Sequence, residues 1–226
     1  MEVSSHRVSL LPLVVIIVGC SACWGGCRAQ VPIPARIDGF VYGGKPPLWG
    51  ETVVVEAFLD PVCPDSRDAW PALKKVVEHY SSRVSVVVHL FPLPYHSYAF
   101  IACRSIHAVN KLNPSFVYPL LEKFFKDQEG YYNLPTYQKS RATVVNEITK
   151  NLVAPIMGET NLAAYTAGFN DSQSDMATRI SFKNGCARGV TGTPYFFVNG
   201  IPINDSGSPL EYKYWISVLD PLVGKM

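Results

Sequence analysis

The sequence predicts an α/β protein in which a long helical segment separates two groups of strands. Residues 52–59 (TVVVEAFL) and 83–90 (RVSVVVHL) are β-branched apolar runs with the length of buried strands. Residues 95–186 repeat their apolar positions at helical spacing. A strand, a tight turn and a second strand follow at residues 195–203. This order indicates a sheet with a helical insertion.

The N-terminus is typical of a secretory signal rather than of a folded element. The apolar run at residues 10–18 (LLPLVVIIV) is shorter than the roughly 20 residues that span a membrane, but it has the length of a signal-peptide core. Small residues up to Ala29 follow, so residues 1–29 are expected to be removed. An uncleaved anchor and a bacterial lipoprotein box at residues 17–20 (IVGC) are the alternatives.

A lead-in arm rich in Pro and Gly at residues 30–50 is expected to precede the domain at residues 51–226. We expect a short strand near residues 37–41 of this arm. A helix is predicted at residues 65–80, between the two buried strands. Four apolar side chains share one face of that helix: Trp70, Leu73, Val76 and Val77.

The helical insertion is expected at about residues 96–186. Apolar spacing predicts its helices around residues 100–106, 116–125, 141–151 and 176–186, with a short one near Leu162. After it, residues 195–198 (YFFV), the turn Asn199-Gly200 and residues 201–203 are expected to form a hairpin, and residues 210–219 a last helix.

The composition excludes several classes of protein. A hydrophobic content of 48% with 17% charged residues is unlike a disordered or coiled-coil chain. The net charge of +2 gives no electrostatic reason to expect nucleic acid as a partner. Once the signal is removed, no membrane span is expected either.

Three cysteines remain after removal of the signal: Cys63, Cys103 and Cys186. Because three is odd, at least one thiol is free or pairs outside the chain in an oxidising compartment. Cys63 lies between the end of a buried strand and the first turn of a helix. Unpaired N–H groups and the positive end of the helix dipole stabilise a thiolate at such a place.

A second segment suited to chemistry is GVTGTPYFFVNG at residues 189–200. Its proline, Pro194, follows Gly-Thr at the start of a strand, where a cis peptide bond is expected. Together with FLDPVCPDS at residues 58–66, this segment resembles the thioredoxin superfamily, and specifically its DsbA-like branch. The resemblance covers the chain from about Thr52 to the C-terminus and includes the inserted helices.

The resemblance implies a thioredoxin fold with an inserted helical subdomain and thiol–disulfide exchange as the ancestral activity. Cys63 would be the nucleophile, and Ser66 and Pro194 would complete the catalytic site. Pro64, Asp65 and Thr193 would contact the substrate, an extended peptide beside Pro194.

Two positions depart from the family pattern. The family has a second cysteine where this chain has Ser66, so an outside thiol, or the partner itself, must release a mixed disulfide from Cys63. The family also often has a buried carboxylate six residues before the nucleophile, where this chain has Ala57; we expect Glu56 on the other face of the strand. Asp65 opposes the thiolate by its charge. The Ser66 hydroxyl is expected to donate to the thiolate or to cap the helix.

Cys103 and Cys186 lie on predicted amphipathic helices. They can be small buried hydrophobic residues, a disulfide with each other, or a thiol that resolves an adduct on Cys63. Cys103 and His107 have a spacing that can hold a metal, but the sequence offers no further ligand, so no metal is predicted. Asn170 and Asn204 each begin an Asn-Asp-Ser sequon and are candidates for glycosylation.

These observations favour a monothiol exchanger acting on protein or peptide thiols and disulfides, secreted or in the endomembrane lumen, or periplasmic or lipid-anchored in a bacterium. No cofactor is expected, although glutathione could act as the resolving thiol. One alternative is a redox-inactive thioredoxin-fold module that binds peptides or proteins. The other is a glutathione-dependent transferase or isomerase of the kappa type, whose members usually carry Ser where Cys63 stands.

Overall fold

The computed structural model describes residues 33–34, 36–43, 50–203 and 208–224. The expected signal at residues 1–29 lies outside these residues. In the described part, five strands form one sheet in the order β1-β3-β2-β4-β5. The strands are β1 (Phe40–Tyr42), β2 (Val53–Leu59), β3 (Val84–Leu90), β4 (Tyr195–Val198) and β5 (Ile201–Pro202).

The centre of the sheet is a parallel pair flanked by antiparallel neighbours. β2 runs parallel to β3 in a register that places Val53 opposite Val84, whereas β4 runs antiparallel to β2 and β1 antiparallel to β3. All seven residues of both central strands are buried. Burial on both faces explains why these strands are continuous apolar runs rather than alternating ones.

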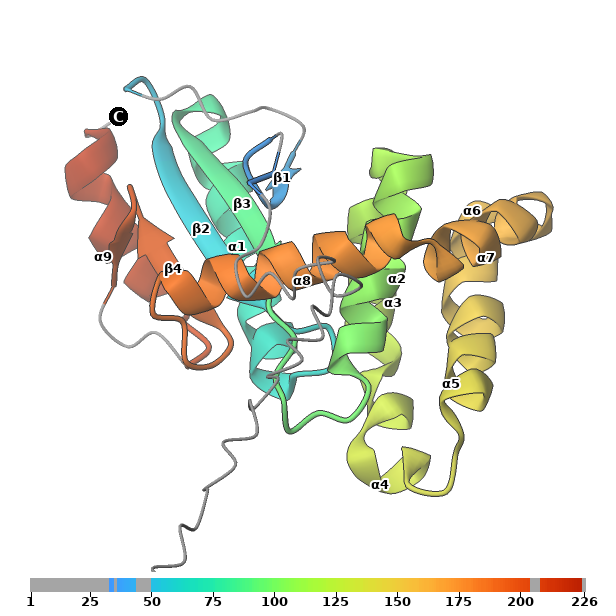
Figure 1. The fold of residues 1–226 in the computed structure, drawn as a ribbon. Helices are drawn as coiled ribbons and strands as arrows, with labels where there is room; N and C mark the ends of the chain where they lie inside the picture. Colours follow the sequence, from blue (N-terminus) through green and yellow to red (C-terminus); the bar gives the residue numbers. More distant parts are fainter. Residues whose placement is uncertain (1–32, 35, 44–49, 204–207, 225–226) are drawn as a thin grey trace, which may run out of the picture. The chain divides into compact units, whose positions relative to one another are not determined.

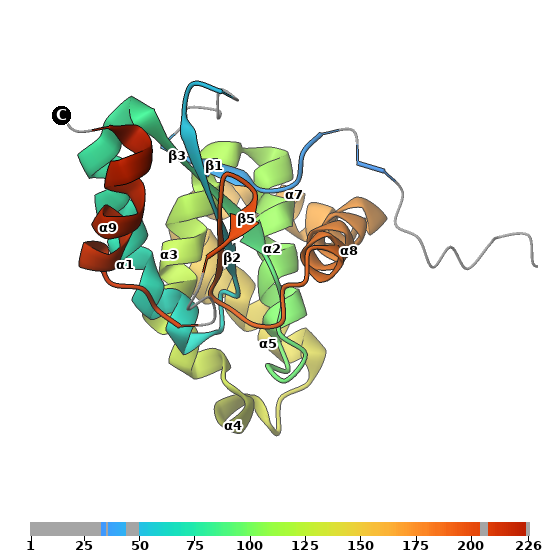
Figure 2. The same cartoon turned by 90° about the vertical axis from the view of Figure 1, so that its left-hand side faces the viewer.

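Helices cover both faces of the sheet (Figures 1 and 2). On one face, α1 (Pro64–Tyr80) packs beside α9 (Tyr212–Val223), and the Tyr80 hydroxyl donates to Asp220 at 2.7 Å. On the other face lies α8 (Ser172–Ala187), the long helix that crosses in front of the sheet in Figure 1. This helix leads directly into the segment that precedes β4.

The helical insertion occupies residues 99–187 and begins and ends close to its predicted limits. Before α8 it contains α2 (Ala99–Leu112), α3 (Val117–Asp127), α4 (Asn133–Thr136), α5 (Arg141–Ile148), α6 (Ala154–Met157) and α7 (Leu162–Asn170). Its buried side chains belong to the same apolar core as the α1 face of the sheet. The insertion is therefore packed against the α/β part through a shared core.

Several element boundaries differ from the predictions, and two of the differences have a local physical cause. β1 begins at Phe40 rather than near Ile37, because Gly39 turns the chain at φ +105° just before it. The helix predicted at residues 141–151 ends at Ile148 and continues as a π-helical turn, Thr149–Val153. α8 begins at Ser172, before its first expected residue, because the Asp171 carboxylate accepts from the N–H of Gln173 and caps it.

The four-residue helix α4 was not predicted, since a single helical turn is too short to show a repeat of apolar positions. Among the described helices, none combines the length and the apolar character that a membrane crossing requires.

Candidate functional site

Cys63 lies where β2 passes into α1, at the N-cap position of that helix. β2 ends at Leu59, and a tight turn closes when the N–H of Cys63 donates to the carbonyl of Asp60 at 3.0 Å. Pro64 is the first residue of the helix, where its missing N–H is no loss. The sulfur therefore sits at the positive end of a 17-residue helix, as the sequence predicts.

The segment before β4 approaches this sulfur from the opposite side. The Thr193–Pro194 peptide bond is cis, and the Cys63 Sγ donates to the carbonyl of Thr193 at 3.3 Å. The antiparallel register, which places Tyr195 opposite Phe58, brings the two segments together. Thr193 is buried, and among the described residues its hydroxyl has no hydrogen-bond partner.

Cys63 is packed in a small apolar cluster separate from the main core. Only 4% of the residue is exposed. The other buried members of the cluster are Phe58, Phe91, Leu93, Val190 and Phe197. A low-polarity setting strengthens each charge interaction made within it, but it also penalises an unpaired thiolate.

Ser66, which stands in place of the family's second cysteine, does not behave as expected. Its buried hydroxyl accepts from the N–H of Asp60 at 3.2 Å, and the structure shows no side-chain cap at the start of α1. The prediction that it bonds to the sulfur or caps the helix is therefore wrong. Of the two residues between Cys63 and Ser66, Pro64 is half-buried and Asp65 is exposed.

Asp60, which was not singled out from the sequence, organises this turn. Its carboxylate is fully buried and accepts from the N–H of Val62 at 2.8 Å and the N–H of Leu93 at 3.1 Å. The same carboxylate lies 2.9 Å from Nδ1 of His96. A carboxylate directly after a buried strand was the signal that could have indicated it.

Gln128 supports the turn from the insertion. Its fully buried amide donates to the carbonyls of Pro61 at 3.2 Å and Cys63 at 3.3 Å. The Tyr132 hydroxyl in turn donates to the Gln128 amide oxygen at 2.7 Å. The helical insertion thus holds the backbone of Cys63, a contact no local sequence pattern indicates.

Glu56 lies on the face of β2 opposite Ala57, as alternation along the strand predicts. It forms a two-pronged ion pair with Arg188, at 2.5 and 2.8 Å, just after α8. Burial raises the pKa of Glu56, but hydrogen bonds from His89 and Arg188 outweigh burial and lower it to about 2. The guanidinium of Arg188 also lies 4.0 Å from the ring centre of Phe197.

His89 extends this charged group towards the arm. Its Nε2 lies 3.2 Å from Glu56 and its Nδ1 lies 2.9 Å from Asp38. Burial lowers the pKa of His89, but the two carboxylates raise it overall. A carboxylate oxygen against each ring nitrogen requires a proton on both, so the ring is an imidazolium. Arg188, Glu56, His89 and Asp38 therefore form a buried array of alternating charge.

The other cysteines are free thiols in the structure. Cys103 is fully buried in α2, where burial raises its pKa, and Cys186 is exposed near the end of α8. The Cys103–Cys186 disulfide considered above is not formed, because one thiol is enclosed in the core and the other faces solvent. Asn170 is exposed at the end of α7, and Asn204 lies outside the described residues.

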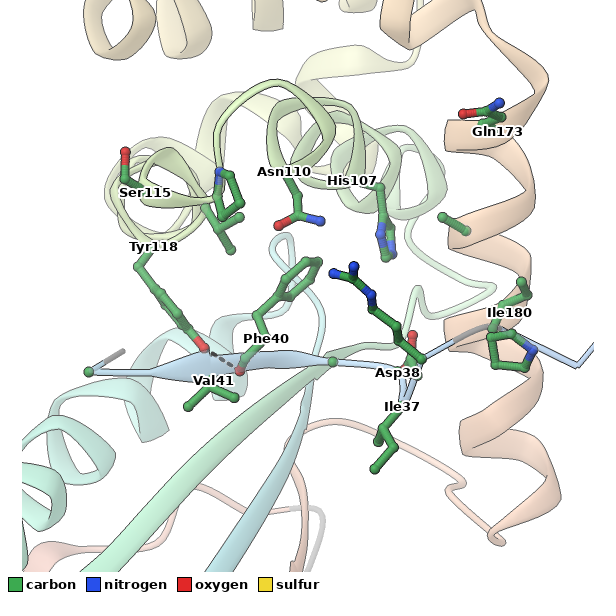
Figure 3. A pocket seen from close by; sticks show the side chains of 17 residues that line it. Ile37, Asp38, Phe40, Val41, His107, Asn110, Ser115, Tyr118, Gln173 and Ile180 are labelled. Carbon is green, nitrogen blue, oxygen red and sulfur yellow. Dashed lines mark hydrogen bonds between the residues drawn. The ribbon is translucent and has the colours of Figure 1, made fainter. Parts of the chain in front are cut away.

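A second concave region is distinct from the cysteine site. A pocket of about 1090 Å³ lies between the arm, α2 and α8, and none of its lining residues belongs to the Cys63 site. Figure 3 shows His107 and Asn110 of α2 facing Phe40 of the arm. Within the described residues there is no cluster of three metal-ligating side chains, and His107 Nε2 lies 3.1 Å from the Ser181 hydroxyl.

Comparison with protein families finds one that covers most of the chain. The family model described as Thioredoxin matches residues 51–217. Comparison with curated protein sequences finds no relative.

Several solved structures share the fold over most of their length. A thioredoxin-like oxidoreductase from Silicibacter pomeroyi has 16% identity and a TM-score of 0.59, with 81% of this chain and 91% of the other covered. The thiol-disulfide exchange protein alpha-DsbA2 from Wolbachia pipientis has 14% identity and a TM-score of 0.62, with 81% of this chain and 87% of the other covered. A periplasmic thioredoxin-like protein from Salmonella enterica has 15% identity and a TM-score of 0.53, with 83% of this chain and 91% of the other covered. The likeness establishes a thioredoxin-like fold with a helical insertion.

Proposed function

We propose, from the premise that this chain belongs to the thioredoxin family, that it performs thiol–disulfide exchange through the single cysteine Cys63. The observation that carries this proposal is the position of the Cys63 sulfur. It lies at the start of α1 and 3.3 Å from the carbonyl of Thr193, beside a cis Thr193–Pro194 bond. A sulfur so placed has the helix dipole to stabilise its thiolate and a peptide-binding edge next to it.

The proposed reaction has two exchange steps. In the first, the Cys63 thiolate attacks one sulfur of a substrate disulfide, forms a mixed disulfide and releases the other substrate sulfur as a thiolate. In the second, an outside thiol attacks the substrate sulfur of that mixed disulfide and frees Cys63. We assign the second step to an outside thiol because Ser66 has no sulfur and Cys103 is enclosed in the core; the Cys186→Ser variant below tests the remaining, exposed thiol. The protein therefore reduces or rearranges disulfides and uses no resident cofactor; glutathione fits the role of resolving thiol.

The substrates that fit this site are protein or peptide disulfides. Pro64 and Asp65 directly follow Cys63 in α1, the Thr193 carbonyl lies 3.3 Å from its sulfur, and the edge beside Pro194 suits an extended backbone. The signal-like run at residues 10–18 supports a secreted or endomembrane location, or a periplasmic one in a bacterium. The periplasmic thioredoxin-like protein of similar fold points the same way.

The test is a map of thiol reactivity combined with an exchange assay on the mature chain. Alkylation rates at Cys63, Cys103 and Cys186 are measured across pH by peptide mass spectrometry, and turnover is followed with a fluorogenic disulfide peptide and glutathione. Cys63 should react fastest, and Cys63→Ser should abolish turnover. Cys186→Ser, which removes an exposed thiol, is the matched control and should leave turnover unchanged. Turnover that survives in Cys63→Ser would refute the proposal.

One observation favours a second candidate, a redox-inactive module that binds peptides. Cys63 is only 4% exposed and its thiol donates to the carbonyl of Thr193, so a substrate disulfide has little access to the sulfur. In that case Cys63 reacts no faster than Cys186, no mixed disulfide forms, and an extended peptide binds with equal affinity to Cys63→Ser.

A further inference from the structure

The second step of the proposed reaction contains a proton transfer that none of the residues discussed so far performs. The outside thiol must lose its proton before its sulfur can attack, because the thiolate is the nucleophile. A peptide thiol with a pKa of about 8.5 is only about 3% ionised at pH 7. A base beside the mixed disulfide could therefore accelerate release by up to roughly 30-fold. The inference that follows rests on the proposed function.

His96 has the geometry of such a base. Its Nδ1 lies 2.9 Å from the fully buried carboxylate of Asp60, which can only accept a hydrogen bond. The proton of the neutral ring is therefore held on Nδ1, and Nε2 carries the free lone pair. Nε2 makes no hydrogen bond with any described residue, and the His96 side chain is 19% exposed. A carboxylate that fixes the tautomer of a partly exposed imidazole is the arrangement general bases use.

His96 also lies beside the reactive cysteine. The Asp60 residue that holds its ring accepts the Cys63 N–H on its carbonyl, so one residue contacts both. Leu93, in the same loop, belongs to the apolar cluster around Cys63. The adjacent Tyr95 is 60% exposed, and its pKa is raised first by burial and then by the charges of Cys63 and Asp60. The loop from Leu93 to His96 thus lies close to Cys63.

The other described histidines are unsuited to this role. His89 has a carboxylate against both ring nitrogens, and His107 bonds to Ser181 through Nε2. His79 is exposed in the last turn of α1, about 24 Å along the helix from Cys63 at 1.5 Å per residue. Asp65 is an exposed carboxylate near the site, but a carboxylate is a much weaker base than an imidazole.

We propose that His96 accepts the proton of the thiol that releases Cys63. The incoming thiol gives its proton to Nε2, and its sulfur attacks the substrate sulfur of the mixed disulfide. The bond from that sulfur to Cys63 breaks, and the electron pair remains on Cys63 as a thiolate. The incoming sulfur is oxidised to the new disulfide and the Cys63 sulfur is reduced. The proton then passes from Nε2 to the Cys63 thiolate or to water, which restores both groups. Asp60 is the positioning residue for the imidazole.

The experiment measures release separately from attack. A mixed disulfide between Cys63 and a fluorogenic peptide is prepared in the wild-type chain and in His96→Asn, which keeps an N–H near the position of Nδ1 but has no basic nitrogen. Release is then timed with a peptide thiol and with an aromatic thiol that is fully ionised at pH 7. We expect the peptide thiol to release roughly 10- to 30-fold more slowly in His96→Asn, because only its own ionised fraction can attack. The ionised aromatic thiol should release both proteins at the same rate.

The pH profile and a matched control complete the test. In His96→Asn, release by the peptide thiol should rise about tenfold per pH unit up to its own pKa, whereas the wild type should show a shallower rise. His79→Gln, the control on an exposed imidazole, should behave as the wild type. Equal slowing with both thiols would show that His96 only shapes the site, and no slowing with either would show that it takes no part; both overturn the inference. If the wild type forms no mixed disulfide at all, the proposed function itself fails.

Discussion

Replacing Glu56 by Gln should show how strongly the buried charged array stabilises the fold. Gln keeps the size of the side chain but removes the charge that pairs with Arg188 at 2.5 and 2.8 Å and with His89 at 3.2 Å. His89 would then keep only Asp38, and Arg188 would have no carboxylate partner among the described residues. Removing one partner of a buried ion pair is strongly destabilising, because the other charge stays buried without compensation.

The change in the pKa of Glu56 on folding gives the size of its contribution to the free energy of unfolding. A fall from 4.5 to about 2 on folding corresponds to about 3 kcal/mol at 1.36 kcal/mol for each factor of ten. Because the pKa is lower in the folded state, this stability is present above pH 4.5 and is lost as the pH falls towards 2. By pH 3, about 2 kcal/mol of it has gone. The variant lacks this contribution, so its free energy of unfolding should depend less on pH over that range.

Urea unfolding followed by tryptophan fluorescence measures both effects. We expect Glu56→Gln to lower the free energy of unfolding by about 3 kcal/mol at pH 7 and by about 1 kcal/mol at pH 3. The control is Glu129→Gln, since the Glu129 side chain is 78% exposed and lies 3.6 Å from Arg67, a pairing worth little. A loss at pH 7 no larger than in this control, or an equal loss at both pH values, would refute the reasoning.

Three further changes test other parts of the structure by the same unfolding assay. Leu73→Ala empties a fully buried position of α1 and should cost about 2–5 kcal/mol; a loss below 1 kcal/mol would contradict its place in the core. Gly185→Ala places a Cβ 2.5 Å from the Phe91 ring, so it should cost about 1–3 kcal/mol, and stabilisation would count against that contact. Since the pKa of His89 is raised in the fold, its contribution is full below pH 6.5 and should fade as the pH rises through the folded value; a His89→Gln variant should lack that slope.

The fold could be predicted where hydrophobicity is continuous or periodic. β2 and β3 are buried on both faces and α1 has one apolar face, so each is visible within its own segment. The beginning of β1 could not be predicted in this way. Ile37 is apolar but 76% exposed, and the strand starts only after the turn at Gly39. The apolar character of a residue alone does not show whether that residue will belong to a strand at the edge of the sheet.

The same distinction holds for the candidate site: residues marked by a local sequence pattern could be predicted, and long-range contacts could not. Cys63 and Pro194 could be identified because a helix start and a strand start mark their places in the sequence. The long-range contacts of the turn after β2 could not, since His96 contacts Asp60 from 36 residues away and Gln128 contacts Cys63 from 65 residues away. Such contacts depend on how the insertion packs, and a single sequence carries no local trace of that packing. The expectation for Ser66 was wrong because its hydroxyl accepts a hydrogen bond from the N–H of Asp60 instead.

The hydrogen bond between the Ser66 hydroxyl and the Asp60 N–H bears on how this chain can change over evolutionary time. A cysteine placed at position 66 would restore the dithiol motif, but a thiol is a weak acceptor and would leave that buried N–H poorly satisfied. The same turn carries the carboxylate that holds His96. A second cysteine at position 66 would thus require compensating changes in this turn. The serine is part of the hydrogen bonding that holds the turn, and not only a position without sulfur.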